Sequence, residues 1–135
     1  MNLSVIHLML TSALFSLILV IQLVHYPCFK YISEEAFSAS MRFHQKRISF
    51  IVIPLMTSEL CISFYQLMQN LKLINLIIIL IVILIWLSTA FLQVPLHQKL
   101  LLRKNEKEIE QLVQTNWIRT LLWSLELILF VGELG

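Results

Sequence analysis

Residues 76–87 read LIIILIVILIWL, twelve consecutive residues without a polar side chain. With their neighbours they form a predicted helix over about 73–92. A helix of that length crosses the roughly 30 Å hydrocarbon core of a bilayer, because each residue adds about 1.5 Å. A transmembrane strand would require apolar and polar residues to alternate, and this stretch does not alternate. The stretch therefore predicts a membrane-spanning helix.

Other apolar segments meet or approach the same length. The remaining predicted helices cover about 3–24, 48–68 and 117–131. The first has no charged side chain, the second contains Glu59, and the last is short and contains Arg119 and Glu126. A chain of 135 residues is sufficient for one domain. We therefore expect residues 1–135 to form a single all-α domain, an integral membrane, antiparallel four-helix bundle.

The composition predicts that the chain lies in a lipid bilayer and does not bind nucleic acid. Apolar residues make up 59% of the chain and charged residues 13%, against about 45–50% and 25% in soluble domains. The net charge of +2 is too small to predict binding to nucleic acid. No Gly-rich phosphate loop, G-x-S-x-G or H-E-x-x-H motif is present. Cys28 and Cys61 are predicted to be free thiols.

The distribution of basic residues predicts the orientation in the membrane. No Lys or Arg precedes Lys30, so the first segment lacks the basic region of a signal peptide and we expect it to be retained. The connections between helices 1 and 2 and between helices 3 and 4 carry eight basic residues, whereas the opposite side carries only Lys72. Both connections are therefore predicted to be cytoplasmic, with both termini outside the cytoplasm of an inner or plasma membrane.

Polar residues are predicted to converge at the cytoplasmic end of the bundle. Antiparallel packing brings the ends of helices 1 and 3 together with the starts of helices 2 and 4. The residues placed there are His25, Tyr26, His44, Arg47, Gln93, His97, Asn116 and Arg119. The fourth histidine, His7, lies near the opposite end. An Arg inside a membrane helix requires a partner or water, and Glu59 and Glu126 are the acidic residues within the spans.

The leading functional hypothesis is an enzyme acting on a hydrophobic aromatic or quinone-like molecule that enters from the lipid. Substrate binding is assigned to Asn116, Arg119, Gln93 and Tyr26. Asn116 and Arg119 hold a substrate oxygen, while His97 or His25 moves a proton. Glu59 lies deeper as a second acid or base, because intramembrane carboxylates are candidates for function. This hypothesis requires no cofactor.

Two alternatives remain open. Histidines on facing helices of a bundle are common ligands, so His25, His44 and His97 are candidate ligands for haem or a metal ion. The other alternative is a non-catalytic assembly protein whose partner is a second copy of the chain or another membrane protein. The apolar helix over 73–92 would then serve as the partner face.

Two short motifs resemble a known family. Val94-Pro95-Leu96-His97 and the later run TNWIRT at 115–120 resemble the helix end and helix start of the anthrone oxygenase-like family of small four-helix membrane proteins. Pro27 and Pro54 also fit that pattern. The resemblance implies oxidation of anthrones to anthraquinones with molecular oxygen and without an evident metal or flavin.

The chain departs from that family pattern at several positions. His97 stands where the pattern has Asn, His25 and His44 are additional, and Trp117 follows Asn116 instead of preceding it. The resemblance therefore supports the fold more strongly than the anthrone substrate.

Overall fold

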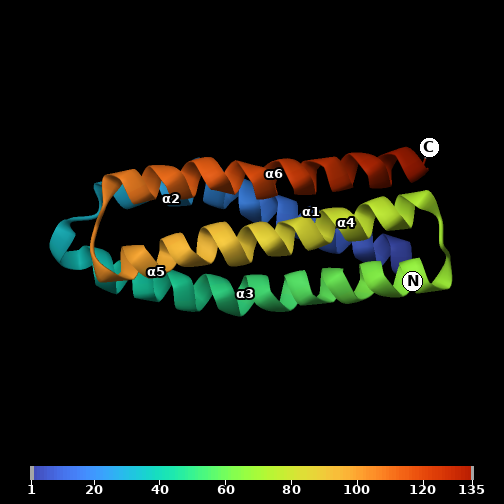
Figure 1. Ribbon diagram of the computed structural model, residues 1–135, viewed down its shortest axis with the longest axis horizontal. Coiled ribbons are helices and arrows are strands. Elements are labelled where there is room, and N and C mark those ends of the chain that lie inside the picture. The colour runs from blue at the N-terminus through green and yellow to red at the C-terminus, as the bar shows by residue number, and fades with distance from the viewer. Residues whose placement is uncertain (1, 135) are drawn as a thin grey trace.

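The computed structural model describes residues 2–134, with side chains for residues 2–132. Every regular element in this part of the chain is helical, which confirms the predicted all-α class. The elements join into four long rods over 3–31, 34–69, 73–102 and 106–134. The rods lie side by side (Figure 1). Their elements are α1 (Leu3–Val20), the π-helical η1 (Ile21–His25), α2 (Tyr26–Cys28), the short 3₁₀ turn η2 (Phe29–Tyr31), α3 (Glu34–Gln69), α4 (Leu73–Ser88), the π-helical η3 (Thr89–Gln93), α5 (Val94–Leu102) and α6 (Glu106–Leu134).

The rods run antiparallel to their neighbours along the chain. The N-terminal and C-terminal ends lie at the same end of the bundle as the turn between α3 and α4 (Figure 1). The connections that precede α3 and α6 lie together at the opposite end. Lys104 joins these two connections, because its Nζ donates to the backbone oxygens of Lys30 at 2.7 Å and Ile32 at 2.8 Å. One end of the bundle therefore brings together segments that are far apart in sequence.

Two helices begin earlier than predicted. α3 begins at Glu34 rather than near residue 48, and α6 begins at Glu106 rather than near residue 117. Carboxylates in the first turn of each helix favour these starts, because the N-terminus of a helix carries a partial positive charge. Asn105 Oδ1 also accepts a hydrogen bond from the backbone N–H of Glu108 at 3.2 Å. Both extensions are polar, so an apolar-length criterion did not detect them.

Two rods contain a short π-helical segment just before a proline. Pro27 and Pro95 have no backbone N–H and cannot continue the regular hydrogen-bond ladder. The chain instead widens by one residue, and the N–H of Tyr26 bonds to the carbonyl oxygen of Ile21, five residues earlier. η3 ends in the same way. Segments of this kind are frequent at functional sites, and both are adjacent to the predicted polar end.

The interior of the bundle is unusually polar and its surface unusually apolar. The buried polar residues are His7, Thr11, Gln22, His44, Glu59, Ser63, Ser88, Gln93, Asn116, Arg119, Thr120 and Glu126. Large hydrophobic side chains such as Phe50, Leu80 and Ile128 are exposed instead. Three rods of the described chain, spanning 3–31, 34–69 and 73–102, are long and apolar enough to cross a membrane. The rod formed by α6 does not meet the same criterion.

Candidate functional site

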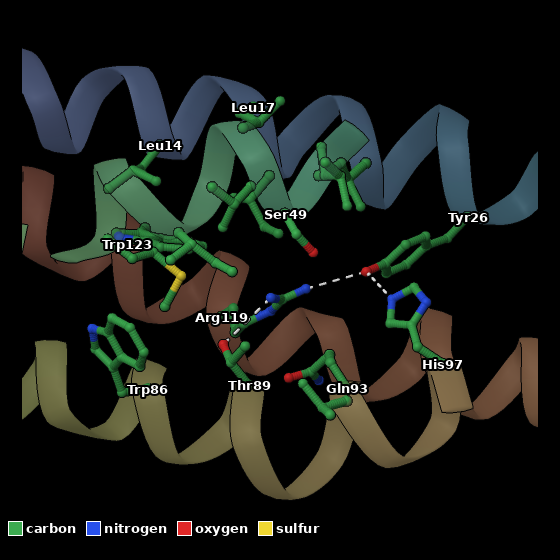
Figure 2. Close-up of a pocket in the computed structure, with 17 residues that line it drawn as sticks. Leu14, Leu17, Tyr26, Ser49, Trp86, Thr89, Gln93, His97, Arg119 and Trp123 are labelled. Carbon is green, nitrogen blue, oxygen red and sulfur yellow. Dashed lines mark hydrogen bonds between the residues drawn. The ribbon is translucent and has the colours of Figure 1, made fainter. Parts of the chain in front are cut away.

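A stripe of polar side chains on α6 supplies the centre of the site. Asn116, Arg119, Thr120, Trp123 and Glu126 follow each other at steps of three, one, three and three residues. Helical periodicity places such residues on one face. All five are buried, so the stripe faces the interior of the bundle. Stick representation shows Arg119 and Trp123 projecting toward side chains from the other rods (Figure 2).

Arg119 is a buried cation whose partners are neutral. Its Nε donates to Asn116 Oδ1 at 3.0 Å, and its Nη2 makes a second bond to the same oxygen. Nη1 lies 3.4 Å from Thr89 Oγ1, and Nη2 lies 3.4 Å from the Tyr26 hydroxyl. Within the described side chains no carboxylate forms an ion pair with it. The partners that a buried Arg requires are therefore neutral groups, and neither Glu59 nor Glu126 is among them.

Asn116 is held in place from the other side. Its Nδ2 donates to Gln22 Oε1 at 2.7 Å, and Gln22 Nε2 donates to the backbone oxygen of Val113 at 3.0 Å. Asn116 and Gln22 are both almost fully buried. This chain of bonds orients the oxygen that receives Arg119, so the guanidinium is positioned by the protein alone.

Tyr26 connects Arg119 to His97. The Tyr26 hydroxyl lies 2.9 Å from His97 Nε2. A guanidinium can only donate, so the hydroxyl accepts from Arg119. Its own proton is then free to be donated to His97 Nε2, the other polar atom beside it. His97 Nδ1 then carries the ring proton, and it has no partner among the described residues. The site thus contains a buried N–H donor that the protein does not use.

The three histidines predicted at this end do lie together. His25 Nε2 is 2.6 Å from His44 Nδ1, and the rings of His44 and His97 stack with centroids 5.6 Å apart. Arg47 lines a hollow of about 610 Å³ together with His25 and His44. His25 and His44 are thus bonded to each other, and His97 is bonded to Tyr26, so each ring uses one nitrogen within the protein.

A cavity of about 140 Å³ lies against Arg119. Its polar wall contains Tyr26, Thr89, Gln93, His97 and Arg119, and Figure 2 shows these side chains grouped at one end. The rest of the wall is mostly apolar and includes both Trp86 and Trp123. A cavity of about 150 Å³ with apolar walls is known to hold a benzene ring. The space therefore has about the size of one aromatic ring.

Gln93 adds another donor to this cavity. Its Oε1 accepts from Ser88 Oγ at 3.2 Å, while its buried Nε2 has no partner among the described side chains. Gln93, His97 and Arg119 all line the cavity. The polar wall is thus rich in N–H donors and poor in acceptors, which favours a ligand that presents oxygen acceptors.

Glu59 lies outside this cavity. Its carboxylate accepts from Trp123 Nε1 at 3.1 and 3.2 Å and from Thr11 Oγ1 at 3.1 Å. Trp123 lines the cavity with its ring and turns its N–H away toward Glu59. This corrects the expectation that Glu59 lies deeper in the same pocket. It belongs to a second polar cluster, nearer the termini.

Sequence reasoning did not identify the partners of Glu59 in that second cluster. His7 and Glu126 are completely buried beside it. The signal in the sequence is a pair of polar residues one helical turn apart in two of the apolar segments, His7 with Thr11 and Glu59 with Ser63. Comparison with protein-family models, curated proteins and solved structures finds no match to the chain.

Proposed function

We propose that the chain is an integral membrane protein whose four rods all cross the bilayer. The support for the fourth rod comes from the outer face of α6. Trp117, Leu121, Leu125, Ile128 and Val131 are exposed there. Its charged side chains at 119 and 126 are buried, so they lower its average hydropathy without facing lipid. Lipid would therefore meet an apolar surface on α6 as it does on the other rods.

The orientation follows from the positions of the basic residues. The two connections that lie together at one end carry Lys30, Arg103 and Lys104, whereas the α3–α4 turn carries Lys72 alone. We assign the basic end to the cytoplasm. A reporter that is active only outside the cytoplasm is expected to be active when fused after residue 135 and inactive when inserted at 103–105. The reverse pattern would overturn the orientation.

The function proposed for the cavity is binding of a small hydrophobic molecule with a ring oxygen, of the quinone or phenol class. One observation supports it above all: a buried guanidinium, Arg119, borders an apolar cavity, and its partners among the described residues are all neutral. Hydrogen bonds from a charged donor are roughly twice as strong as neutral ones. A carbonyl or phenolate oxygen of the ligand would therefore form its strongest hydrogen bond with Arg119.

The same wall suggests how a proton reaches the bound oxygen. His97 Nε2 is the ring nitrogen on the side of Tyr26 and receives the proton of its hydroxyl, whereas Nδ1 lies on the opposite edge of the ring (Figure 2). The Tyr26 hydroxyl lines the cavity, so it can give its proton to a ligand oxygen instead, and the phenolate left behind lies 3.4 Å from Arg119 Nη2. General acid catalysis of this kind contributes typically about 10²–10⁴-fold. Asn116 acts as a positioning residue for Arg119. The oxygen chemistry implied by the family resemblance stays a prediction.

Tryptophan fluorescence tests this function. Trp86 and Trp123 line the cavity, so a benzoquinone with a short alkyl tail is expected to quench the detergent-purified protein saturably. Replacing Arg119→Gln removes a charged donor worth about 1.5–3 kcal/mol, so affinity should fall about 10–100-fold. Arg103→Gln is the matched control, because Arg103 is exposed at the end of α5.

Circular dichroism must show unchanged helix content in both variants. Saturable quenching with equal affinity in the wild type, Arg119→Gln and Arg103→Gln would overturn the assignment of Arg119. Quenching that only rises in proportion to the quinone would indicate partitioning into detergent. That outcome would favour the alternative interpretation as a non-catalytic docking protein.

A further inference from the structure

The second polar cluster lies on three rods near the end that holds both termini. α1 supplies His7 and Thr11, α3 supplies Glu59, and α6 supplies Trp123 and Glu126. One nitrogen of His7 and one oxygen from each carboxylate all lie within 4.8 Å of one another. The ring and both carboxylates are completely buried. The cluster is separate from the cavity around Arg119, and the inference drawn from it does not rest on the proposed function.

The hydrogen bonds show which nitrogen of a neutral His7 ring faces the carboxylates. Nδ1 lies 2.7 Å from Gln66 Oε1, which can only accept, so Nδ1 carries the ring proton. Nε2 of the neutral ring then presents its lone pair 3.4 Å from Glu126 Oε1. Ser63 Oγ is 3.2 Å from Nε2, but it directs its proton to the backbone oxygen of Glu59 at 2.7 Å.

The cluster has more acceptors than donors. The hydroxyl of Thr11 lies 3.1 Å from Glu59 Oε1 and 3.3 Å from Glu126 Oε1. The indole N–H of Trp123 is directed at Glu59 alone. Glu126 Oε2 is buried and has no partner among the described side chains. A lone pair and a carboxylate oxygen therefore face each other with no proton assigned between them.

The charges of the cluster also favour a bound cation. Two ionised carboxylates beside a neutral imidazole carry two negative charges, and burying them unpaired has a large desolvation penalty. No Lys or Arg forms an ion pair with either carboxylate within the described side chains. A single divalent cation would balance both charges at once while using the free lone pair of His7.

We propose that His7, Glu59 and Glu126 form a binding site for one divalent first-row transition-metal ion. One imidazole and two carboxylates suit Zn²⁺, Fe²⁺ or Mn²⁺, and the absence of thiolate in this set disfavours Cu⁺. Bonds of about 2.0–2.1 Å to a tetrahedral ion place its ligands about 3.3–3.4 Å apart. The His7 to Glu126 separation of 3.4 Å has this value.

The surroundings of the three ligands match those of metal sites. A ligating histidine almost always donates its second ring N–H to an oxygen acceptor, and Gln66 provides that acceptor. Gln66 also lines a hollow of about 260 Å³ at the end of the bundle, together with Phe130. The Phe130 ring packs edge-on against His7 with centroids 4.7 Å apart. This hollow therefore reaches two side chains, Gln66 and Phe130, that contact His7.

The test uses Zn²⁺ and a zinc-chelating dye with the full chain in detergent. After treatment with a chelator and dialysis, the wild type is expected to take up close to one Zn²⁺ per chain. Losing a hydrogen-bond partner of a metal ligand typically weakens metal binding about 10–100-fold. Glu126→Gln removes a ligand itself, so it should weaken Zn²⁺ binding by more than that. Glu110→Gln is the matched control, because Glu110 is exposed on the same helix.

A second variant leaves all three ligands intact. Gln66→Leu removes the acceptor of His7 Nδ1 and, on the exposed side, a hydrogen bond of 3.4 Å to Ser4 Oγ. A drop of about 10–100-fold in Zn²⁺ affinity is expected from the loss of that acceptor. His97→Ala should bind Zn²⁺ as the wild type does, because His97 lies in the other cluster. Since quinone quenching depends on Arg119 and Zn²⁺ uptake on Glu126, the two proposals fail separately.

Two outcomes would overturn the site. One is a wild type that competes for Zn²⁺ no better than Glu126→Gln, with helix content equal in both. The other is Zn²⁺ affinity that survives in Glu126→Gln and is lost in His44→Ala or His97→Ala. The latter result would assign the ion to the histidines at the opposite end.

Discussion

Trp123→Ala is expected to lower the free energy of unfolding by about 3–5 kcal/mol, as for other large aromatic side chains removed from packed interiors. Trp123 is 1% exposed and touches both polar clusters. Its ring lines the cavity beside Arg119, and its N–H donates to both oxygens of Glu59 at 3.1 and 3.2 Å. The substitution therefore opens a void and leaves a buried carboxylate short of a donor.

Denaturant titration in detergent micelles, followed by circular dichroism, measures this loss. Trp117→Ala is the matched control, since Trp117 lies on the same helix and is 42% exposed, and a change within about 1 kcal/mol is expected. Trp123→Phe keeps a buried aromatic ring but removes the N–H and part of the volume, so its loss should lie below that of Trp123→Ala and include about 1–3 kcal/mol for the hydrogen bond to Glu59. Equal losses for the alanine variants at 117 and 123 would contradict the central role of Trp123.

Asn116→Leu is expected to lower the free energy of unfolding by about 2–4 kcal/mol, because it removes partners from buried polar groups. Asn116 Oδ1 accepts from Arg119, and its Nδ2 donates to Gln22 at 2.7 Å. Leucine provides neither bond. Asn116→Asp should lose less, since a carboxylate at this position pairs with the guanidinium. The same carboxylate would compete with a ligand oxygen, so quinone quenching should fall in Asn116→Asp.

The control for these variants is Gln114→Leu, which changes an exposed amide on the same helix into the same residue. Its unfolding free energy should stay within about 0.5 kcal/mol of the wild type. Stability of Asn116→Asp below that of Asn116→Leu would contradict the pairing with Arg119. Unchanged quinone affinity in Asn116→Asp would contradict the view that a neutral environment around Arg119 makes it available to a ligand.

The sequence by itself determined the architecture of this chain. Apolar runs such as 76–87 specify helices by length, and connections of a few residues specify antiparallel neighbours. From these rules alone, His25, His44 and His97 belong at one end of the bundle with Arg119. Each residue of a helix adds a fixed rise of about 1.5 Å, so the depth of a residue in the bundle can be counted from the sequence.

Only the tertiary structure decided which side chains meet. The second polar cluster joins His7, Glu59 and Glu126, which are 52 and 67 residues apart along the chain. Whether these side chains meet depends on how each helix is rotated about its axis. That rotation follows from packing between helices and is not encoded by spacing within one of them. The π-helical segments before Pro27 and Pro95 add a further rotation. For this reason the sequence located the polar ends, while the partners of Arg119 and the convergence of His7, Glu59 and Glu126 required the fold.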